Sequence, residues 1–470
     1  RVEDEEQALY NCFMEVEECY MLSVELDVTS QRQKQQFVKH PSLFLAQKMR
    51  DCEVRLTRLK PEHRELFDRA KTKEVNSFIS NAAVRRCLDL AEENEAKNSG
   101  RLMRCRWVLT WKPTPEESLD EARQEVSERP ESTTLTADAR RKAKARIVLL
   151  GYEHPDLLTE AHKTSSPVQA VLTRNLSYQL VMQMGWNIEG IDMSTAFLQT
   201  LPTEEEKRLW TSGVKELREA LQIPEGGVMR ILKNFYGSTT APRNLWENVN
   251  QSMLELGGTR IKGDKCFWLW TEKVQDENGD VLTRPLGFMA GHVDDFHRAG
   301  NENSAAWKQI KQSIDQRYKW GSVKLNAYRH AGTDLEIVND ATLGRCLVVD
   351  QSYYVETLQD IDITPERFCQ GDATMTPKEI SACRTSLGAL QWLAVQTQPL
   401  ICARCNLLIT ELAGSPVMRT AQEIQELVRE LRKHSTQLKF FKLPHVKTWK
   451  DVCVVGLGDQ AHNNRPRGGS

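Results

Sequence analysis

Three aspartates in two separate stretches of the sequence could together form an acidic site. Asp294 and Asp295 are adjacent and interrupt the mostly apolar stretch 286–300, while Asp192 ends a second strand-like stretch at 186–193. An Asp pair alone is typical of a hairpin tip, because the Asp side chain bonds its own backbone. Carboxylates brought together from two strands, however, provide what a divalent metal needs for phosphoryl chemistry. The pattern therefore predicts a strand–turn–strand hairpin whose tip meets Asp192.

A basic segment offers a second kind of chemistry. Five cations fall within residues 140–146, directly before the apolar strand 147–150, and an earlier predicted strand at 104–112 also has basic ends. This patch includes Lys144 and Arg146 and could bind a triphosphate. A solvated basic run explains the same residues equally well, so both interpretations stay open.

A glycine turn precedes a predicted helix in the segment 234–246. Tyr236, Gly237 and Arg243 belong to this segment. Glycine lets the backbone approach a planar base or a template strand closely. An ordinary turn followed by a helix accounts for the same residues almost as well.

The elements that must position the aspartates follow from periodicity. Apolar residues at helical intervals predict a buried helix over 168–184, and alternation predicts that the next strand ends at Asp192. A helix start follows at 194–198, where Ser194 or Thr195 could supply the cap. Asp192 is then expected at the carboxyl end of a strand, the usual place for a working carboxylate in a sheet-based fold.

Further elements are predicted on either side of this region. The N-terminal residues 1–100 are charged and largely helical in pattern, and the acidic, Pro-rich stretch 113–136 is typical of a long loop. Periodicity also predicts strands at 228–233 and 262–270, an amphipathic helix at 304–318, a small hairpin of strands 328–337 and 346–350, helices at 351–361, 378–395, 399–412 and 421–441, and a strand at 452–459.

Length and composition limit the class of protein. At 470 residues and 53.8 kDa the chain exceeds one ordinary core, so several subdomains are expected. Hydrophobic residues (40%) and charged residues (27%) are present in proportions typical of a globular protein. Because the formal net charge is only −2, any nucleic-acid surface must be local. No apolar run reaches membrane-spanning length.

Cysteine usage and the chain ends suggest where the protein works. Twelve cysteines without regular spacing, and no signal peptide at the acidic N-terminus, are typical of free thiols in a reducing intracellular compartment. Cys402 and Cys405 form a single Cys-x-x-Cys pair, and buried helical cysteines explain it better than a zinc site. The chain begins with Arg and stops abruptly, so a fragment of a longer polyprotein-like chain is expected.

The order of these motifs resembles the reverse transcriptase of copia-type long-terminal-repeat retrotransposons, over residues 74–459. Four motifs in the right order are far more specific than any one of them. The matching segments are Lys144–Val148 followed by Gly151-Tyr152, Asp192-Met-Ser-Thr-Ala-Phe-Leu198, Tyr236-Gly-Ser-Thr-Thr-Ala-Pro-Arg-Asn-Leu-Trp246 and His292-Val-Asp-Asp295, with further matches at 332–337 and 385–393.

The resemblance implies an α+β fold of the right-hand polymerase type. Fingers and a palm with an antiparallel sheet would occupy residues 74–330, and a thumb and helical connection would occupy 331–450. Residues 1–73 would form a helical N-terminal extension, and 451–470 would be the truncated start of an RNase H-like domain. Asp459 resembles the first acidic residue of that RNase H site.

The resemblance also implies roles for the acidic residues. Asp192 and Asp294, with the Met193 carbonyl, would bind two Mg²⁺ (or Mn²⁺) ions, and Asp295 would support them. The ions would promote attack of a primer 3′-hydroxyl on a nucleotide.

Other residues would bind the substrates. Lys144 and Arg146 would hold the β- and γ-phosphates, and Phe197 would pack under the sugar and reject a 2′-hydroxyl. Tyr236 and Gly237 would lie against the templating base pair, and Arg243 belongs to the same nucleotide- and template-binding motif.

The implied partners are an RNA template, a DNA primer, dNTPs, and the integrase and RNase H parts of the same Pol polyprotein. The implied location is intracellular, in cytoplasmic virus-like particles or the nucleus, with no membrane attachment. His292 departs from the family's usual Tyr, and Thr240 stands where the family often has Gln. The His292 change and the long stretch at 113–136 motivate one alternative, an inactive or domesticated nucleic-acid-binding relic. Two separate alternatives are a metal-dependent nuclease or phosphohydrolase that uses the same acidic residues, and a helical interaction protein with incidental Asp pairs.

Overall fold

A computed structural model gives the arrangement of most of the chain. It describes residues 53–54, 56–113, 141–159, 164–202, 206–275, 279, 281–446 and 451. The predictions for residues 1–52, for the loop at 114–136 and for the strand at 452–459 with Asp459 lie outside the described residues.

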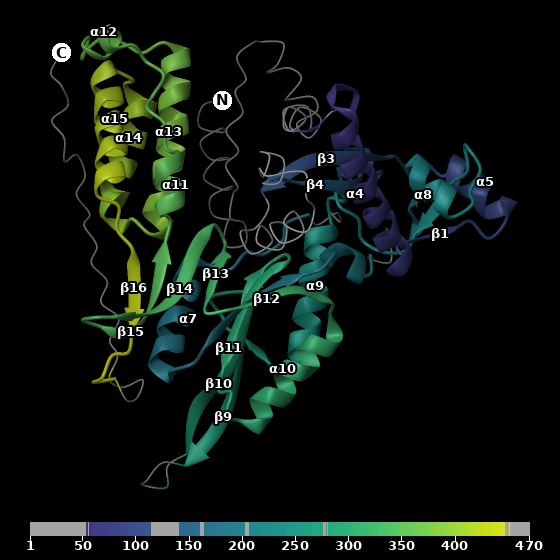
Figure 1. The fold of residues 1–470 in the computed structure, drawn as a ribbon, viewed down its shortest axis with the longest axis horizontal. Coiled ribbons are helices and arrows are strands. Elements are labelled where there is room, and N and C mark those ends of the chain that lie inside the picture. The colour runs from purple at the N-terminus through teal and green to yellow at the C-terminus, as the bar shows by residue number, and fades with distance from the viewer. Residues whose placement is uncertain are drawn as a thin grey trace, which may run out of the picture.

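A six-stranded antiparallel sheet occupies the middle of the molecule (Figure 1). The short outer strand β8 (Thr259–Arg260) lies at one edge and β12 at the other, in the order β12-β5-β11-β10-β9-β8. The other five strands of the sheet are β5 (Ile188–Met193), β9 (Phe267–Gln275), β10 (Val281–His292), β11 (Asp295–Gly300) and β12 (Trp320–Leu325).

Helices cover both faces of this central sheet because its strands are apolar on both sides. Helices α9 (Ala241–Glu255) and α10 (Ala305–Arg317) share one core with the sheet, and α7 (Val171–Met184) shares another. Strand β10 shows the alternation: Phe288 lies in the α7 core and Met289 in the α9–α10 core.

Glycines let α10 approach the sheet closely. A Cβ atom at Gly287 would lie 2.4 Å from the Trp307 ring, and one at Gly300 would lie 2.3 Å from it. Both contacts are far shorter than van der Waals distance, so the buried Trp307 requires glycine on β10 and β11.

An N-terminal lobe, built from residues before strand β5 and from residues 206–231 after it, lies to the right of the central sheet in Figure 1. A four-stranded sheet, order β1-β7-β6-β2, and the two-stranded ribbon β3–β4 form its framework. Its elements are η3 (Leu56–Arg58), α4 (Pro61–Ser80), β1 (Val84–Arg86), α5 (Leu90–Asn98), β2 (Leu102–Met103), β3 (Cys105–Pro113), β4 (Arg141–Leu149), η5 (Gly151–Glu153), η7 (Glu206–Arg208), β6 (Trp210–Thr211), α8 (Lys215–Ala220) and β7 (Met229–Ile231).

The C-terminal part combines a second sheet with a helical bundle, at the left of Figure 1. The four-stranded sheet has the order β13-β14-β15-β16, and the bundle has its own apolar core, formed by residues between 355 and 431. The elements are β13 (Ala327–His330), β14 (Thr333–Asp340), β15 (Gly344–Asp350), α11 (Ser352–Thr357), α12 (Pro365–Phe368), α13 (Pro377–Gln396), η8 (Pro399–Ile401), α14 (Cys402–Gly414), α15 (Met418–Lys433) and β16 (Leu438–Phe441).

The mixed helix-and-sheet composition agrees with the predicted α+β class. The α10 helix is confirmed with Ser304 as its cap, whose side chain accepts from the Trp307 backbone N–H. The prediction of free cysteines is confirmed for eight cysteines, and Cys405 is buried on α14. None of the helices in the described part of the chain is long and apolar enough to span a bilayer.

Several predicted boundaries were wrong in the first half of the chain. Arg141, Lys142, Lys144 and Arg146 lie within β4, because β4 pairs with β3 along its whole length, from Arg141 to Leu149. Helix α7 begins at Val171, not at 168. No side chain caps η6 (Ala196–Gln199), since Thr195 adopts a left-handed conformation there.

Two more corrections fall in the second half. The predicted strand 328–337 is two strands, β13 and β14, because Ala331 and Gly332 both have positive φ and reverse the chain. The charged helix predicted to reach residue 441 ends at Lys433, since 438–441 form β16 and pair with β15.

Candidate acidic site and its surroundings

The hairpin of β10 and β11 presents the first two aspartates. His292 pairs with Asp295 across the strands, so Val293 and Asp294 form the turn. Val293 has a φ of 58°, a left-handed conformation that is uncommon for a branched residue. The predicted strand, tight turn and strand are therefore present. Only Asp294 lies in the turn, however, because Asp295, also expected there, is the first residue of β11.

Strand β5 brings the third aspartate to this tip. Asp192 is the Cα partner of Asp295 in the β5–β11 register, and the Met193 N–H donates to the Asp294 carbonyl at 2.8 Å. Burial raises the pKa of the Asp192 carboxyl, and the nearby charges of Asp294 and Asp295 raise it further. Strand pairing thus brings the three predicted aspartates into one acidic site, comprising Asp192, Asp294 and Asp295.

The donor chemistry of this acidic site fits Mg²⁺. Within the described ranges no three His, Cys, Asp or Glu side chains already surround a metal-sized point, so the protein alone does not form a complete cage. Mg²⁺ commonly takes only one or two carboxylates and completes its octahedron with substrate phosphates and water. Burial and the charges of Asp294 and Asp295 together raise the pKa of Asp192, and a bound divalent cation would oppose both effects.

Asp295 has further contacts on the side of the β13–β14 turn. Its Oδ2 accepts from the Ala331 N–H at 3.1 Å. Its Oδ1 lies 3.1 Å from His330 Nδ1, although that nitrogen is not aligned for a hydrogen bond. The β13–β14 turn of the second sheet therefore fixes the orientation of the Asp295 carboxylate.

A histidine cluster, formed by Gln169, His297 and His330, lies beneath the hairpin. Both histidines are almost fully buried, and their rings stack with centroids 4.5 Å apart. The Gln169 amide joins them, with Nε2 3.1 Å from His297 Nε2 and Oε1 3.4 Å from His330 Nε2. Burial lowers the pKa of His297 well below its usual value, so this imidazole is neutral at pH 7.

His292, the departure from the family pattern, has a defined place beside this cluster. Its Nδ1 lies 3.1 Å from the Pro167 carbonyl oxygen. Burial lowers the pKa of His292, partly opposed by this hydrogen bond and by Asp294. The imidazole therefore ties the hairpin to the segment that enters α7.

Two cations on β4 approach the acidic site from the N-terminal lobe. We call Lys144 and Arg146 the cation pair; both influence the pKa of Asp192. Burial lowers the pKa of Lys144 to about 8, and the positive charges of Arg146 and Lys112 add to this effect. The structure thus brings the predicted phosphate-binding cations and the predicted metal-binding carboxylates together.

Aromatic side chains line the space beside the cation pair. The Arg146 guanidinium centre lies 4.7 Å from the Tyr236 ring centroid, and Phe197 meets that ring edge-on at 5.1 Å. The Leu149 N–H donates to the Tyr236 carbonyl at 2.7 Å, which fixes the Tyr236 backbone against β4. Phe197, predicted to contact the sugar, therefore packs on a residue predicted to contact the base pair.

Gly237 is required by a close backbone approach. It has a φ of 84°, and a Cβ atom there would lie 2.2 Å from the Leu149 carbonyl oxygen. Gly151, which faces Gly237, is restricted in the same way: a Cβ atom added to it would lie 2.2 Å from the Gly237 carbonyl oxygen. Neither glycine can carry a side chain without separating β4 from the Tyr236 turn.

Arg243 is not brought into this group by its contacts. Its Nε donates to Glu247 at 2.7 Å, one turn along α9, and its guanidinium lies 4.8 Å from the Trp246 ring. These contacts are local to the helix, and a template-binding role for Arg243 remains a prediction.

Sequence reasoning missed residues that contact the site residues without belonging to the site themselves. Glu74 on α4 pairs with Arg146, and the histidine cluster holds the hairpin. A signal for Glu74 was present: it occupies the same helical stripe as the buried Phe67 and Phe78, an unusual position for a carboxylate. The histidine cluster left no signal, because its members are far apart in sequence.

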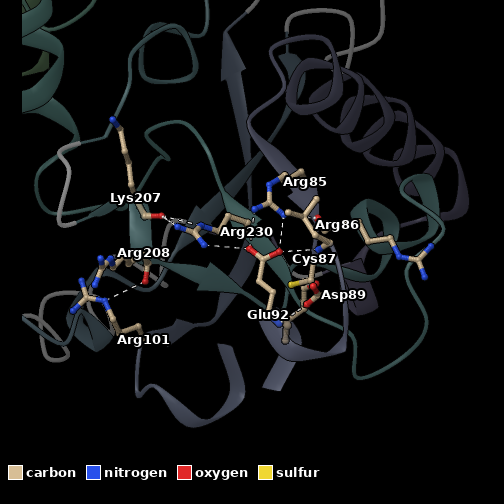
Figure 2. Close-up of polar contacts among 11 residues, drawn as sticks. Arg85, Arg86, Cys87, Asp89, Glu92, Arg101, Lys207, Arg208 and Arg230 are labelled. Carbon is tan, nitrogen blue, oxygen red and sulfur yellow. Dashed lines mark hydrogen bonds and ion pairs between the residues drawn. The ribbon is translucent and has the colours of Figure 1, made fainter. Parts of the chain in front are cut away.

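A second charged cluster, on other elements of the N-terminal lobe, has a structural role (Figure 2). Glu92 on α5 accepts two hydrogen bonds from Arg85 on β1, each 2.8 Å long, and one from Arg230 on β7 at 3.2 Å. These contacts, Arg85 first, lower the pKa of Glu92 to about 2. Arg85 and Arg230 therefore join three elements of the lobe around one carboxylate.

Comparisons with known proteins leave the family open. The chain matches no protein-family model and no curated protein. Among solved structures it is similar to two of a foamy viral protease-reverse transcriptase in complex with double-stranded DNA, one of them described as dRH. In each case the identity is 14%, the TM-score is 0.34 and 88% of this chain is covered, with 62% of the first chain and 73% of the second. Values this low establish no shared activity, so the site itself must carry any functional assignment.

Proposed function

We propose that this protein is an RNA-directed DNA polymerase of a copia-type retrotransposon Pol polyprotein. It would add dNTPs to the 3′-hydroxyl of a DNA primer on an RNA template. The observation that carries the proposal is the register of β5 against β11, which sets Asp192 opposite Asp295 at the hairpin tip and within the influence of the β4 cations.

The acidic site would hold the divalent ions. Asp192 and Asp294, with the Met193 carbonyl, are the proposed ligands for Mg²⁺ or Mn²⁺. When bound, the ions supply a lowered pKa for the primer hydroxyl and compensation for the charge on the leaving pyrophosphate. Asp295, which accepts from the Ala331 N–H, would keep the neighbouring carboxylates in place.

The cation pair and the aromatic residues would bind the nucleotide. Lys144 and Arg146 would hold the β- and γ-phosphates, stabilising charge that develops during transfer. Phe197 would lie against the sugar and Tyr236 against the templating base pair. Template pairing supplies the sequence, so the protein needs to grip only backbone and shape.

The wider layout of the chain follows from the same proposal. The N-terminal lobe would serve as fingers, the central sheet as palm, and the second sheet with the bundle as thumb and connection. RNase H and integrase parts of the polyprotein, and action in virus-like particles or the nucleus, are the expected context.

Primer extension tests the proposal directly. Wild-type protein, Asp294→Asn and the control Asp340→Asn would be incubated with poly(rA)–oligo(dT) and dTTP, with Mg²⁺, with Mn²⁺ or with chelator. Asn keeps the shape of Asp but lacks its charge, so Asp294→Asn should reduce extension by roughly 1,000-fold or more while primer–template affinity stays within a few-fold. Asp340 lies on β14 and pairs with Lys439, so its variant should extend normally.

Two results would reject the proposal. Undiminished extension by Asp294→Asn would remove the metal assignment. Wild-type protein that binds the template in a salt-sensitive way but never extends the primer would identify a nucleic-acid-binding relic.

A further inference from the structure

Glu74 is a buried carboxylate that the proposed reaction does not use. It lies on α4 with an exposed fraction of 4%, beside the buried Val75 and Phe78. A carboxylate without compensation in such a place costs free energy, and burial raises the pKa of Glu74. The question is therefore what its pairing with Arg146 does for the site.

Its two hydrogen bonds both reach β4. Oε2 accepts from Arg146 Nη1 and Oε1 accepts from the Ile147 N–H, each at 3.3 Å. The Leu149 N–H, two residues along β4, donates to the Tyr236 carbonyl. Two neighbouring N–H groups of β4 therefore have acceptors outside the β3–β4 ribbon: the Glu74 carboxylate for Ile147 and the Tyr236 carbonyl for Leu149.

The Arg146 side chain continues this contact into the site. One guanidinium nitrogen bonds Glu74, and the guanidinium lies over the Tyr236 ring, which in turn meets Phe197. Arg146 has five N–H donors, so one bond to Glu74 leaves others for a phosphate. We call this series, from α4 to η6, the stack: Glu74, Arg146, Tyr236 and Phe197.

We infer that Glu74 is a positioning residue for nucleotide selection: its carboxylate orients Arg146 on the Tyr236 ring and thereby sets the position of Phe197. This inference rests on the proposed function. Its consequence is that a group on α4, with no nucleotide contact of its own, controls both triphosphate binding and discrimination between deoxyribose and ribose.

A purely structural role for Glu74 can be separated from this one. The Ile147 N–H needs only an acceptor, which glutamine also provides. Arg146 needs the negative charge, because charge-assisted bonds to guanidinium are about twice as strong as neutral ones. Glu74→Gln therefore keeps the edge of β4 satisfied while it releases Arg146.

Glu216 offers a matched control. It is a partly buried carboxylate on α8 of the same lobe, and it accepts from Lys71 Nζ at 2.9 Å and from Trp107 Nε1 at 2.8 Å. Like Glu74 it accepts from one cationic side chain, here an ammonium, but neither of these two hydrogen bonds involves a residue of the stack. Glu216→Gln should leave nucleotide selection unchanged.

The first experiment measures primer extension with dTTP and with UTP by wild type, Glu74→Gln and Glu216→Gln. For Glu74→Gln we expect the KM for dTTP to rise about 10-fold, kcat to change by less than about 2-fold, and the dTTP-over-UTP preference in kcat/KM to fall about 10-fold. An unchanged preference in a wild-type-like, folded Glu74→Gln protein would overturn the inference.

The second measurement does not depend on extension. In protein labelled with ¹⁵N-arginine, the Arg146 Nε–H signal, assigned with Arg146→Lys, should carry a ring-current shift from Tyr236. Loss of this shift in Glu74→Gln supports the inference, and its persistence overturns it. Failure of the proposed function would appear separately, as absent extension by the wild type.

Arg146→Lys decides the matter if Glu74→Gln does not fold. Lysine keeps the charge beside Glu74 but cannot lie flat on the Tyr236 ring. This variant should lose the dTTP-over-UTP preference to a similar extent, about 10-fold. A retained preference would show that the stack does not select the sugar.

Discussion

The acidic site is flanked by two regions that differ in charge and in burial. On one side, the two cationic side chains of β4 are half-buried, and the Arg146 side chain is 27% exposed. On the other, the histidine cluster is almost fully buried, and hydrogen bonds through the Gln169 amide join its two rings. The comparison suggests a division of labour: one region meets a charged substrate, and the other fixes the backbone that carries the carboxylates.

Electrostatics explains why the two tasks are separated. Buried charges are costly unless paired, so groups that must bind an incoming triphosphate need access to water when the site is empty. A neutral, buried network holds its geometry at low electrostatic cost if its donors and acceptors are matched. The acidic site shows the cost: desolvation raises the pKa of the Asp192 carboxyl, and the charges of Asp294 and Asp295 raise it further.

The largest effect should follow from removing charge at the acidic site. Asp192→Asn should reduce primer extension by roughly 1,000-fold or more, since it removes a proposed metal ligand. The same change should raise the melting temperature by about 1–4 °C, because the raised pKa of Asp192 means that its ionised form destabilises the folded state at pH 7.

Asp340→Asn is the matched control for this pair of measurements. Its hydrogen bond with Lys439 lowers the pKa of Asp340 to about 2, so here the ionised form favours the folded state. The melting temperature should therefore not rise, and extension should be normal. If the melting temperature changes equally in the two variants, the ionised Asp192 does not destabilise the folded state relative to the ionised Asp340.

Breaking the histidine cluster should affect stability more than catalysis. Gln169→Leu removes the partner of one nitrogen on each of two buried rings, so the free energy of unfolding should fall by about 2–3 kcal/mol. Extension below the melting temperature should stay within a few-fold of wild type. Chemical denaturation and primer extension would measure the two effects.

Gln179→Leu provides the comparison for that variant. Gln179 is a half-buried glutamine on α7 that donates to the Phe441 carbonyl at 2.9 Å. Because water can replace this bond, the loss should be below about 1 kcal/mol. If both variants lose the same stability, the buried cluster is not a special support for the hairpin.

The smallest effect should be a pH dependence on the cationic side. With a pKa of about 8, Lys144 loses its charge at higher pH, so the KM for dTTP should rise several-fold between pH 7.5 and 9.5. Lys144→Arg should flatten this rise, since guanidinium stays charged.

Raising the pH should weaken nucleotide binding by Lys144, but it should increase the contribution of Lys144 to folding stability. The pKa of Lys144 is lower in the folded state than in the unfolded one, so the unfolded chain binds more protons between about pH 8 and 10.5. The Lys144 contribution to the free energy of unfolding should therefore increase across this range. A KM that is independent of pH in the wild type would exclude Lys144 as a phosphate ligand.

The parts that sequence could predict are those coded locally. The hairpin at Asp294 and Asp295, the strand that carries Asp192 and the helix predicted at 304–318 follow from short-range pattern and turn chemistry. The pairing of Asp192 with Asp295 was a hypothesis from residue type, because the sequence of a strand does not specify which other strand it will pair with.

The parts that sequence missed depend on distant partners. Residues 438–441, Leu-Lys-Phe-Phe, form a strand by pairing with β15, and nothing next to them in the sequence shows that this partner strand is available. Glu74 likewise acquires its role from Arg146, which is 72 residues away. Local propensity cannot report either contact.

The return of the chain to β16 makes the helical bundle a removable insertion. Val349 and Leu438 are direct partners in the β15–β16 ladder, so residues 351–437 leave the sheet and re-enter it at the same place. A short hairpin turn could bridge these ends, and the excised bundle carries a core of its own. The acidic site could then be studied in a shorter chain, with the bundle supplied as a separate module or exchanged for another.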